Sequence, residues 1–289
     1  MPSTYNDLYM DVRRQLRKHG VEGAALEARE IVCAASDKTK EEFLRDSRLY
    51  SSDEIEEKAQ ALLARRLNGE PVAYLVGEWE FFGLPLVVSP DVLIPRDDTE
   101  VLAQQAIDYL QKQEGHLRVL DLCTGSGCIG LAIASQIKDC RVVLADYSEK
   151  ALHIARTNVR MNHMQSSTAI MQVNAMEEPP ANFEGYHCIV SNPPYIPTGD
   201  IDGLDASVKE YEPHMALDGG EDGLDFYASI SQKWKKILLP GGKLMFELGI
   251  GQADAVMRLM RHEGFGDLEL FEDTQGIPRV ITGTLCAEI

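Results

Sequence analysis

From Asp97 to its carboxyl terminus the chain alternates short apolar segments with amphipathic stretches, and few folds are compatible with that pattern. The segments are rich in Val, Ile and Leu and are five to seven residues long, as expected for strands buried on both faces of a sheet. Because helices separate most of them, we predict an α/β fold with a doubly wound, mostly parallel, seven-stranded sheet. The last two segments have no helix between them and predict an antiparallel hairpin at the sheet edge. In order, the segments are LRVLDL, RVVLA, TAIMQV, HCIVSN, KLMFEL, LELFE and RVITGTL.

The first 75 residues instead repeat apolar side chains every three or four positions, which is the period of an amphipathic helix. Thr39 precedes Glu42 by three residues and Ser51 precedes Glu54 in the same way, so each pair predicts a capping box at a helix start. Gly69 can adopt the left-handed backbone conformation that commonly ends a helix. These signals predict a small helical bundle. One apolar stripe is Tyr5, Leu8, Val12 and Leu16, and another is Ile55, Ala59, Leu62, Leu63 and Leu67.

The segment between these two regions contains aromatic and β-branched runs around Gly83-Leu84-Pro85, which predict a β-hairpin with its turn at those residues. A helix is expected to start at Asp97, with Asp97 and Glu100 as its cap pair. The expected organisation is therefore a helical domain at 1–75, a hairpin linker at 76–96 and a sheet domain at 97–289.

Charge and composition exclude several classes of protein. The 46 acidic and 28 basic residues give a net charge of −18, which repels a phosphate backbone and argues against direct nucleic-acid binding. No apolar stretch approaches the roughly 18 residues of a membrane span, and the amino-terminal sequence lacks an apolar signal core. The six cysteines show neither C-x-x-C nor another metal-binding spacing, so we expect reduced thiols, no metal site and a cytoplasmic location.

A glycine-rich loop follows the first apolar segment of the sheet region. Gly125, Gly127 and Gly130 satisfy G-x-G-x-x-G, and Asp146 ends the next strand 21 residues beyond Gly125. Such a loop brings backbone close to a ligand, and the acid can accept hydrogen bonds from ribose hydroxyls, which predicts a nucleoside-bearing cofactor. Dinucleotides and S-adenosylmethionine both fit, and a turn that only allows tight packing is the structural alternative. The expected cofactor contacts in this region are Cys123, Thr124, Gly125, Ser126, Gly127 and Asp146.

Asp121 stands just before this loop and favours S-adenosylmethionine over a dinucleotide. Its carboxylate can receive the ammonium group of the methionine moiety, whereas it would repel a pyrophosphate. A buried carboxylate that accepts hydrogen bonds from the loop is the structural alternative, and the two roles are compatible.

The fourth apolar segment leads directly into Asn192-Pro193-Pro194-Tyr195, at the sheet edge where open α/β folds bind ligands. The prolines fix two backbone dihedrals and remove two donors, so the carbonyl groups of this segment are free to face a cleft. Asn192 and the Pro193 carbonyl can accept both hydrogens of a planar NH2 group, and Tyr195 can cover its flat face. A proline-stiffened strand exit with a solvent-facing tyrosine is the alternative.

Together these motifs resemble those of class I methyltransferases that carry an N/D-P-P-Y/F motif and modify amide or exocyclic amine nitrogens. Within that group the chain is similar to the release-factor glutamine N(5)-methyltransferases over nearly its full length. A helical amino-terminal domain followed by a hairpin also matches this family. Besides NPPYIP, the shared segments are VLIPRDDTEVL (92–102), YEPHMALDGGEDGLDFY (211–227) and LLPGGKLMFELG (238–249).

The resemblance implies S-adenosylmethionine as the cofactor, held by the loop from Cys123 to Gly127 and by Asp146. Cys123 replaces the usual glycine of the family, although a thiol is small enough to be accommodated. A second departure is Asn174-Ala175-Met176, which replaces the acidic residue that usually brackets adenine. Met176 is expected to pack on the adenine ring, with Asn174 or a backbone amide at its edge, and a core position for Met176 is the alternative.

The resemblance also implies that the enzyme methylates the glutamine side-chain amide in the GGQ motif of peptide chain release factors. Asn192, Pro193 and Tyr195 would be catalytic, Pro194 would contact the substrate, and Asn192 would also border the cofactor. Positioning is expected to dominate, because the thioether leaving group needs little acid or base help. His187 is therefore interpreted as structural.

Two charged residues lie near the junction of the two regions. Arg96 and Glu100 are interpreted as a surface ion pair, with shaping of the cofactor cleft as the alternative. The helical domain is expected to recognise the protein substrate. Alternative functions are methylation of a ribosomal-protein glutamine, methylation of an adenine amine in nucleic acid, a nicotinamide-dependent dehydrogenase and a non-enzymatic binding module. The sequence gives neither the oligomeric state nor the release factors modified.

Overall fold

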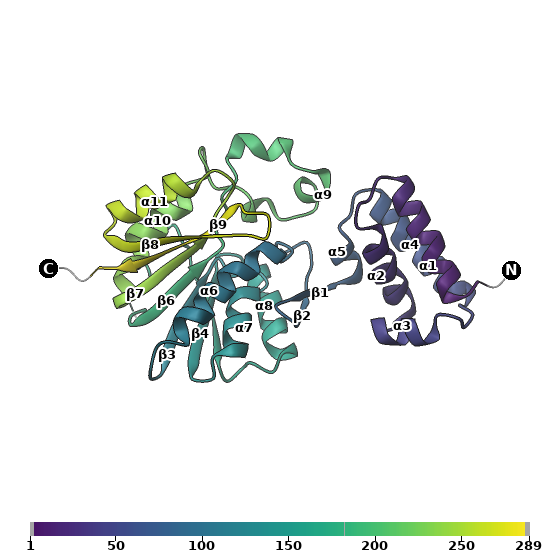
Figure 1. Cartoon of the computed structure of the whole chain (residues 1–289), viewed down its shortest axis with the longest axis horizontal. Coiled ribbons are helices and arrows are strands. Elements are labelled where there is room, and N and C mark those ends of the chain that lie inside the picture. Colours follow the sequence, from purple (N-terminus) through teal and green to yellow (C-terminus); the bar gives the residue numbers. More distant parts are fainter. Residues whose placement is uncertain (1–2, 182, 287–289) are drawn as a thin grey trace. The chain divides into compact units, whose positions relative to one another are not determined.

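The computed structural model describes residues 3–181 and 183–286 and divides into two compact units (Figure 1). The first unit is the chain up to Glu78 together with Asp205–Tyr211, and the second is Trp79–Leu204 together with the chain from Glu212 onward. The division falls inside the first strand, so almost all of the hairpin belongs to the second unit. In the described ranges, no helix combines the length and the apolar character needed to cross a membrane.

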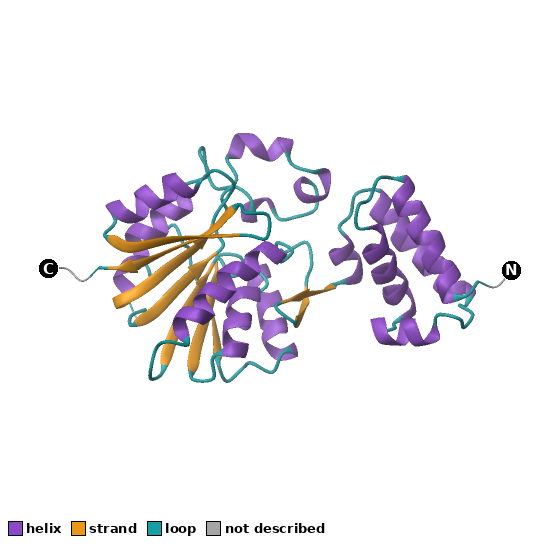
Figure 2. Cartoon of the chain, viewed as in Figure 1, coloured by secondary structure: helices purple, strands orange, loops and turns teal. Residues whose placement is uncertain are grey.

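The first unit is built from helices, as its sequence period predicts (Figure 2). Tyr5, Leu8, Val12 and Leu16 are all buried along one face of the first helix. In the second stripe only Ala59 and Leu63 are fully buried. The helices are α1 (Tyr5–Lys18), α2 (Ala24–Ser36), α3 (Lys40–Asp46), α4 (Asp53–Leu67) and α5 (Val72–Val76).

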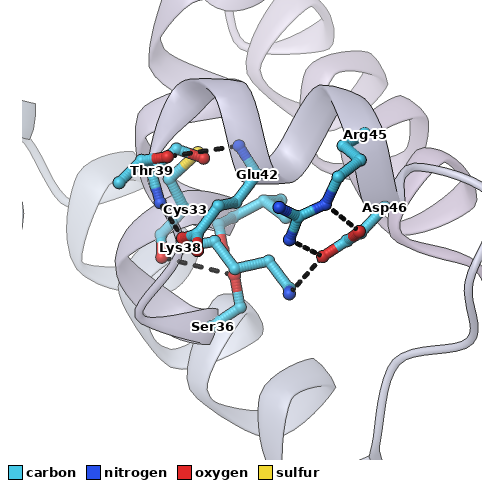
Figure 3. A network of polar contacts seen from close by, with 8 residues as sticks. Cys33, Ser36, Lys38, Thr39, Glu42, Arg45 and Asp46 are labelled. Atoms are coloured by element: carbon cyan, nitrogen blue, oxygen red, sulfur yellow. Dashed lines mark hydrogen bonds and ion pairs between the residues drawn. The ribbon is translucent and has the colours of Figure 1, made fainter.

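The capping box at α3 is confirmed (Figure 3). The Glu42 amide donates to Thr39 Oγ1 at 3.2 Å, and the Thr39 amide donates to Glu42 Oε2 at 3.0 Å. At the end of the same helix, Asp46 accepts from the side chains of Arg45 and Lys38. These donors hold the pKa of the Asp46 carboxyl well below its usual range.

The predicted cap of α4 is wrong by one residue. Ser52, not Ser51, is the N-cap, and its hydroxyl accepts from the Ile55 amide at 3.3 Å. The Ser51 hydroxyl instead donates to Glu56 and to the Ser3 carbonyl. Adjacent serines are equivalent in the sequence, and only these longer-range contacts distinguish them.

The hairpin consists of β1 (Glu78–Phe81) and β2 (Leu84–Val87). Its turn lies at Phe82-Gly83, with φ values of 53° and 74°, and not at Gly83-Leu84-Pro85 as predicted. Two successive positive φ angles match the twist of a two-residue hairpin, and this leaves Leu84 and Pro85 inside the second strand.

The predicted cap pair at Asp97 and Glu100 is also wrong. Asp97–Thr99 form a short 3-10 helix, and α6 (Glu100–Leu110) begins behind it without a side-chain cap. The Glu100 carboxylate accepts from the Phe82 amide at 2.6 Å, so it is used to hold the hairpin turn.

All seven predicted strands form one sheet in the order β5-β4-β3-β6-β7-β9-β8. The pairs from β5 to β7 are parallel, whereas β9 runs antiparallel to both β7 and β8. The predicted antiparallel hairpin is confirmed, and its second strand is inserted next to β7. The strands are β3 (Leu117–Leu122), β4 (Cys140–Asp146), β5 (Thr168–Gln172), β6 (Tyr186–Ser191), β7 (Leu238–Glu247), β8 (Phe265–Glu272) and β9 (Pro278–Leu285).

Helices cover both faces of this sheet, so each face has its own core (Figures 1 and 2). Val119 and Val190 face α6 and α7, whereas Leu120 and Ile189 face the core that includes Trp234. The doubly wound arrangement is therefore confirmed, and it brings the carboxyl ends of β3, β4 and β6 together. The remaining helices of the second unit are α7 (Cys128–Gln136), α8 (Glu149–Met161), α10 (Asp225–Lys233) and α11 (Ala253–His262), and α9 (Ala206–Lys209) belongs to the first unit.

Candidate active site

A pocket of about 610 Å³ lies at these strand ends, within the second unit. Its size falls in the range of about 300 to 1,000 Å³ that is common for small-molecule sites. The predicted site residues that line it are Cys123, Thr124, Gly125, Ser126, Asp146, Asn192 and Pro194. Those that do not are Asp121, Gly127, Met176, Pro193 and Tyr195.

The glycine loop has the backbone that its sequence suggests. Gly125 and Gly127 have φ values of 55° and 85°, and Gly127 is the N-cap of α7. Cys123 also has a positive φ of 62°, which explains why glycine is the usual residue there. A Cβ on Gly130 would come within 2.2 Å of the Leu144 side chain, so this glycine allows the helix to pack tightly on the sheet.

Asp146 ends β4 and lines the pocket. Its carboxylate accepts from the Gly125 amide and from the Ser148 amide, each at 2.9 Å. Burial raises the pKa of Asp146, and these amide donors act against that rise. The carboxylate thus fixes the loop and still borders the cavity.

Asp121 lies behind the loop and is completely buried. Its Oδ2 accepts from the Thr124 hydroxyl at 2.6 Å and from the Gly130 amide at 2.9 Å. Burial raises the pKa of Asp121 to about 7. Within the described ranges Oδ1 receives no hydrogen bond. These contacts match the structural alternative, in which a buried Asp121 carboxylate accepts hydrogen bonds from the loop. Its Oδ1 is left for a further donor.

Asn192 directly follows β6, and its side chain donates from Nδ2 to Thr99 Oγ1 over 3.5 Å. Its Oδ1 accepts no hydrogen bond within residues 3–181 and 183–286. Asn192 and Thr99 both line the pocket. Pro193 and Pro194 are buried, and Pro194 alone of the two reaches the pocket. Tyr195 does not line the pocket, and its hydroxyl donates to Glu247 Oε1 at 3.4 Å.

Three glycines and a glutamine hold the backbone around Tyr195. A Cβ on Gly219 would come within 2.7 Å of Tyr195 Cα, and one on Gly223 within 2.3 Å of its carbonyl oxygen. Gln252 donates from Nε2 to that same oxygen at 2.8 Å. A Cβ on Gly249 would meet the Gln252 side chain at 2.5 Å. Close packing around Tyr195 and Gln252 therefore explains three glycines of the segments 211–227 and 238–249, namely Gly219, Gly223 and Gly249.

Arg96 pairs with Glu212 and not with Glu100, so the predicted surface pair is wrong. Glu212 is only 5% exposed and also accepts from the Ile94 amide at 3.1 Å. Ile94 and Arg96 both line the pocket. The contacts of Glu212 with these residues therefore match the alternative interpretation, in which Arg96 shapes the cleft.

His187 lies outside the pocket lining, whereas Asn174 lines it. His187 accepts at Nδ1 from the Arg118 amide at 3.1 Å, which is a structural contact between β6 and β3, and burial lowers its pKa. Asn174 lines the pocket, but its side chain accepts from the Met176 amide and donates to Glu177. The exposed Tyr147 borders the pocket beside Asp146, although it belongs to none of the predicted motifs.

Two family models match the chain. Residues 7–77 match the PrmC N-terminal domain, and residues 97–204 match the methyltransferase small domain. Over 274 residues the chain is 40% identical to the release factor glutamine methyltransferase of Geobacter sulfurreducens, and the alignment covers 94% of each protein. The chain belongs to the release factor glutamine methyltransferases.

The same family includes a protein of Thermodesulfovibrio yellowstonii that is 38% identical over 257 residues, with 88% of this chain and 90% of that protein aligned. A solved methyltransferase structure from Pyrococcus furiosus superposes with a TM-score of 0.51 at 18% identity and covers 78% of this chain and 98% of that one. That likeness shows the class I methyltransferase fold. Membership of the family makes the chain a methyltransferase, as its motifs predict.

Proposed function

We propose that this enzyme transfers a methyl group from S-adenosylmethionine to the N5 amide nitrogen of the glutamine in the GGQ motif of peptide chain release factors. The observation that carries the proposal is the position of Asn192, which lines the same pocket as the glycine loop and Asp146. An amide acceptor beside a nucleoside site is what methylation of a planar NH2 group requires.

The residues present fit S-adenosylmethionine. Asp146 borders the pocket and is proposed to bind the ribose. Gly125 and Gly127 have positive φ angles and no side chains, so a ligand can approach the loop backbone closely. Asp121 is buried and does not line the pocket, so it can act on a ligand only through its charge, which favours a cationic ligand over a pyrophosphate. When bound, this cofactor supplies a methyl group on a positively charged sulfur with a neutral leaving group.

The protein then has to position the amide nitrogen. Its lone pair forms the new N–C bond while the methyl–sulfur bond breaks and its electrons stay on sulfur, and the nitrogen afterwards releases one proton to water. Asn192 Oδ1 and the Pro193 carbonyl are proposed to accept the two N–H groups. Positive charge that develops on nitrogen strengthens both contacts, which is preferential binding of the transition state.

The first unit is proposed to recognise the release factor. It contains part of the loop that follows the NPPY motif, because Asp205–Tyr211 cluster with it and Tyr211 donates to the Asn68 carbonyl at 3.2 Å. Residues 1–78 carry 15 acidic and 12 basic residues, so this part of the chain is only weakly acidic. The described cysteines are all free thiols, which suits the cytoplasmic location that we propose.

The test is to incubate the full chain with S-adenosylmethionine and an unmodified release factor, and to locate the methyl group by mass spectrometry. We expect one methyl group on the GGQ glutamine. Methylation of a ribosomal protein or of adenine in nucleic acid, with none on the factor, would replace the proposal. Binding of NAD instead of S-adenosylmethionine in calorimetry would overturn it.

A fragment that begins at Val76 tests the assignment of recognition to the first unit. This fragment retains the whole hairpin, so it should keep affinity for the cofactor and methylate a short GGQ peptide, while losing activity on the intact factor. If the fragment methylates the intact factor as fast as the full chain does, recognition lies elsewhere.

A further inference from the structure

One arginine borders the candidate site. Among the residues that the structure describes, Arg96 is the single lysine or arginine in the pocket lining, and His214 is the single histidine. Three aspartates share that lining, namely Asp91, Asp146 and Asp218. A ligand that brings a carboxylate into this pocket therefore needs a donor that offsets these negative charges. In the described lining, Arg96 is the one side chain of fixed positive charge that can supply it.

The Arg96 guanidinium is available to a ligand. Its side chain is 41% exposed, and within residues 3–181 and 183–286 it makes one hydrogen bond, to Glu212. Glu212 does not line the pocket, is 5% exposed and also accepts from the Ile94 amide at 3.1 Å. The buried carboxylate thus holds one part of the guanidinium, and the remaining N–H groups of Arg96 are free to donate.

The strand ends set the direction in which the cofactor crosses the pocket. They follow one another in the order β5, β4, β3 and β6. Asn174 follows β5, Asp146 ends β4 and Asn192 follows β6, and all three line the pocket. In S-adenosylmethionine the ribose lies between the adenine and the sulfur, and the methionine carboxylate lies beyond the sulfur. With the ribose at Asp146 and the reacting methyl group at Asn192, as proposed above, the methionine end belongs on the β6 side.

Arg96 lies on this β6 side. The Thr99 hydroxyl oxygen accepts from Asn192 Nδ2 at 3.5 Å, and the Thr99 amide donates to the Arg96 carbonyl at 3.1 Å. The short 3-10 helix Asp97–Thr99 therefore begins directly after Arg96 and ends at the partner of Asn192. Arg96 and Asn192 are thus connected through Thr99, at the same end of the pocket.

We propose that Arg96 binds the carboxylate of the methionine moiety of S-adenosylmethionine. The inference rests on the proposed function, since it takes S-adenosylmethionine as the cofactor, and it adds the group that recognises the amino-acid end. An arginine suits this task because its planar guanidinium can donate two parallel hydrogen bonds to a carboxylate. Glu212 offsets part of the arginine's charge, so the contact depends on these directed hydrogen bonds more than on long-range attraction.

The experiment measures, by titration calorimetry, the Kd of two ligands for the full chain without any release factor. One ligand is S-adenosylmethionine, and the other is decarboxylated S-adenosylmethionine, which keeps the sulfonium and the amino group and lacks only the carboxylate. In Arg96→Met the Kd of S-adenosylmethionine should rise at least about tenfold, as for the loss of charge-assisted hydrogen bonds. The Kd of the decarboxylated ligand should rise less than about twofold, because that ligand has no carboxylate for Arg96 to bind.

Two further variants sharpen this comparison. Arg96→Lys keeps the charge and loses the planar fork, so the Kd of S-adenosylmethionine should rise by only about threefold. The double variant Arg96→Met with Glu212→Gln leaves no buried charge unpaired, and it should distinguish the two ligands as poorly as Arg96→Met does.

Arg141→Met is the matched control. Arg141 lies near the amino end of β4, where it donates to the Ser166 carbonyl at 2.8 Å, whereas Asp146 ends the same strand at the pocket. Both Kd values should stay within about twofold of the parent in this variant, as for a surface substitution away from the site.

Three outcomes overturn the inference. An unchanged Kd of S-adenosylmethionine in Arg96→Met would show that other groups bind the carboxylate. An equal rise for both ligands would show that Arg96 supports the pocket without binding the carboxylate. A selective rise in His214→Gln that is absent from Arg96→Met would assign the carboxylate to the imidazole.

The same measurements separate this inference from the proposed function. If the parent shows the preference that depends on Arg96 but methylates no release factor, the proposed substrate is wrong and the role of Arg96 stands. If the parent methylates the factor while Arg96→Met binds both ligands as the parent does, the role of Arg96 fails and the proposed function stands. A parent that does not bind S-adenosylmethionine overturns both.

Discussion

The two units of this protein are specified over different distances along the chain. In the first unit, the α3 cap joins residues three positions apart, and the first helix buries a stripe that repeats every three or four residues. In the second unit, the contact between Asn192 and Thr99 spans 93 residues, and that between Ile94 and Glu212 spans 118. Helices that are stabilised by contacts between residues close in sequence can be predicted from that sequence. The contacts of a site at strand ends form only when the whole sheet has folded.

The carboxyl groups of the two units differ in the same way. Asp46 lies at the surface between Arg45 and Lys38, and their hydrogen bonds lower its pKa. Asp121 and Glu247 are buried, and burial raises the pKa of each to about 7. Ionising a buried acid costs stability, so these two groups disfavour the folded state as the pH rises through about 4 to 7, whereas the contribution of Asp46 is lost as the pH falls. Ionisation of the two buried acids therefore destabilises the fold, whereas ionisation of Asp46 stabilises it.

The largest effect is expected for Asn192→Ala. This change removes the proposed acceptor for the substrate amide, so kcat on a release factor should fall at least about a hundredfold. Stability should change little, because Asn192 is only partly buried and makes one long hydrogen bond. The measurement is a single-turnover methylation assay with thermal unfolding as its control. Near-parental turnover would remove Asn192 from the proposed mechanism.

Asp146→Ala should mainly weaken cofactor binding. Loss of charge-assisted hydrogen bonds to the ribose corresponds to about 1.5 to 3 kcal/mol in the free energy of binding. Asp146→Asn should lose less, because one oxygen can still accept from the Gly125 amide that Asp146 now holds at 2.9 Å. Titration calorimetry with S-adenosylmethionine measures both, and an unchanged Kd in Asp146→Ala would show that the ribose is bound by other groups.

The seven strands, the doubly wound topology and the glycine loop could all be predicted from the sequence, because apolar periods and backbone requirements are local. The order of the strands in the sheet, with β9 between β7 and β8, was not predicted. The use of Glu100 was not predictable, since its partner, Phe82, lies in the turn of a hairpin whose own turn was misplaced. Thr99 stands inside a segment recognised from the family resemblance, but nothing in its spacing indicates that it contacts Asn192. Only the completed fold brings the two side chains within 3.5 Å of each other.

Gly219→Ala tests whether the NPPY segment needs its close backbone packing. The added Cβ would lie 2.7 Å from Tyr195 Cα and 2.9 Å from the Pro194 carbonyl oxygen, so the segment has to shift. We expect kcat to fall about tenfold, because a small displacement of a positioned group is costly in catalysis. Gly203→Ala is the matched control, since neither glycine has a positive φ and a Cβ at Gly203 meets nothing within 4 Å. Equal activity of the two variants would show that the packing does not position the site.

The smallest effect is expected for Thr39→Ala, which tests the other side of the comparison. Thr39 caps α3 with its hydroxyl, and loss of such a cap costs about 1 kcal/mol in the free energy of unfolding. Thr39→Ser should retain most of that energy because it keeps the acceptor. Denaturant unfolding of the full chain measures both changes, and cofactor affinity should be unaffected because the pocket is lined entirely by residues of the second unit. A weaker cofactor Kd in Thr39→Ala would mean that the first unit supports the cofactor site, and that the local and the long-range parts of this molecule are not energetically separate.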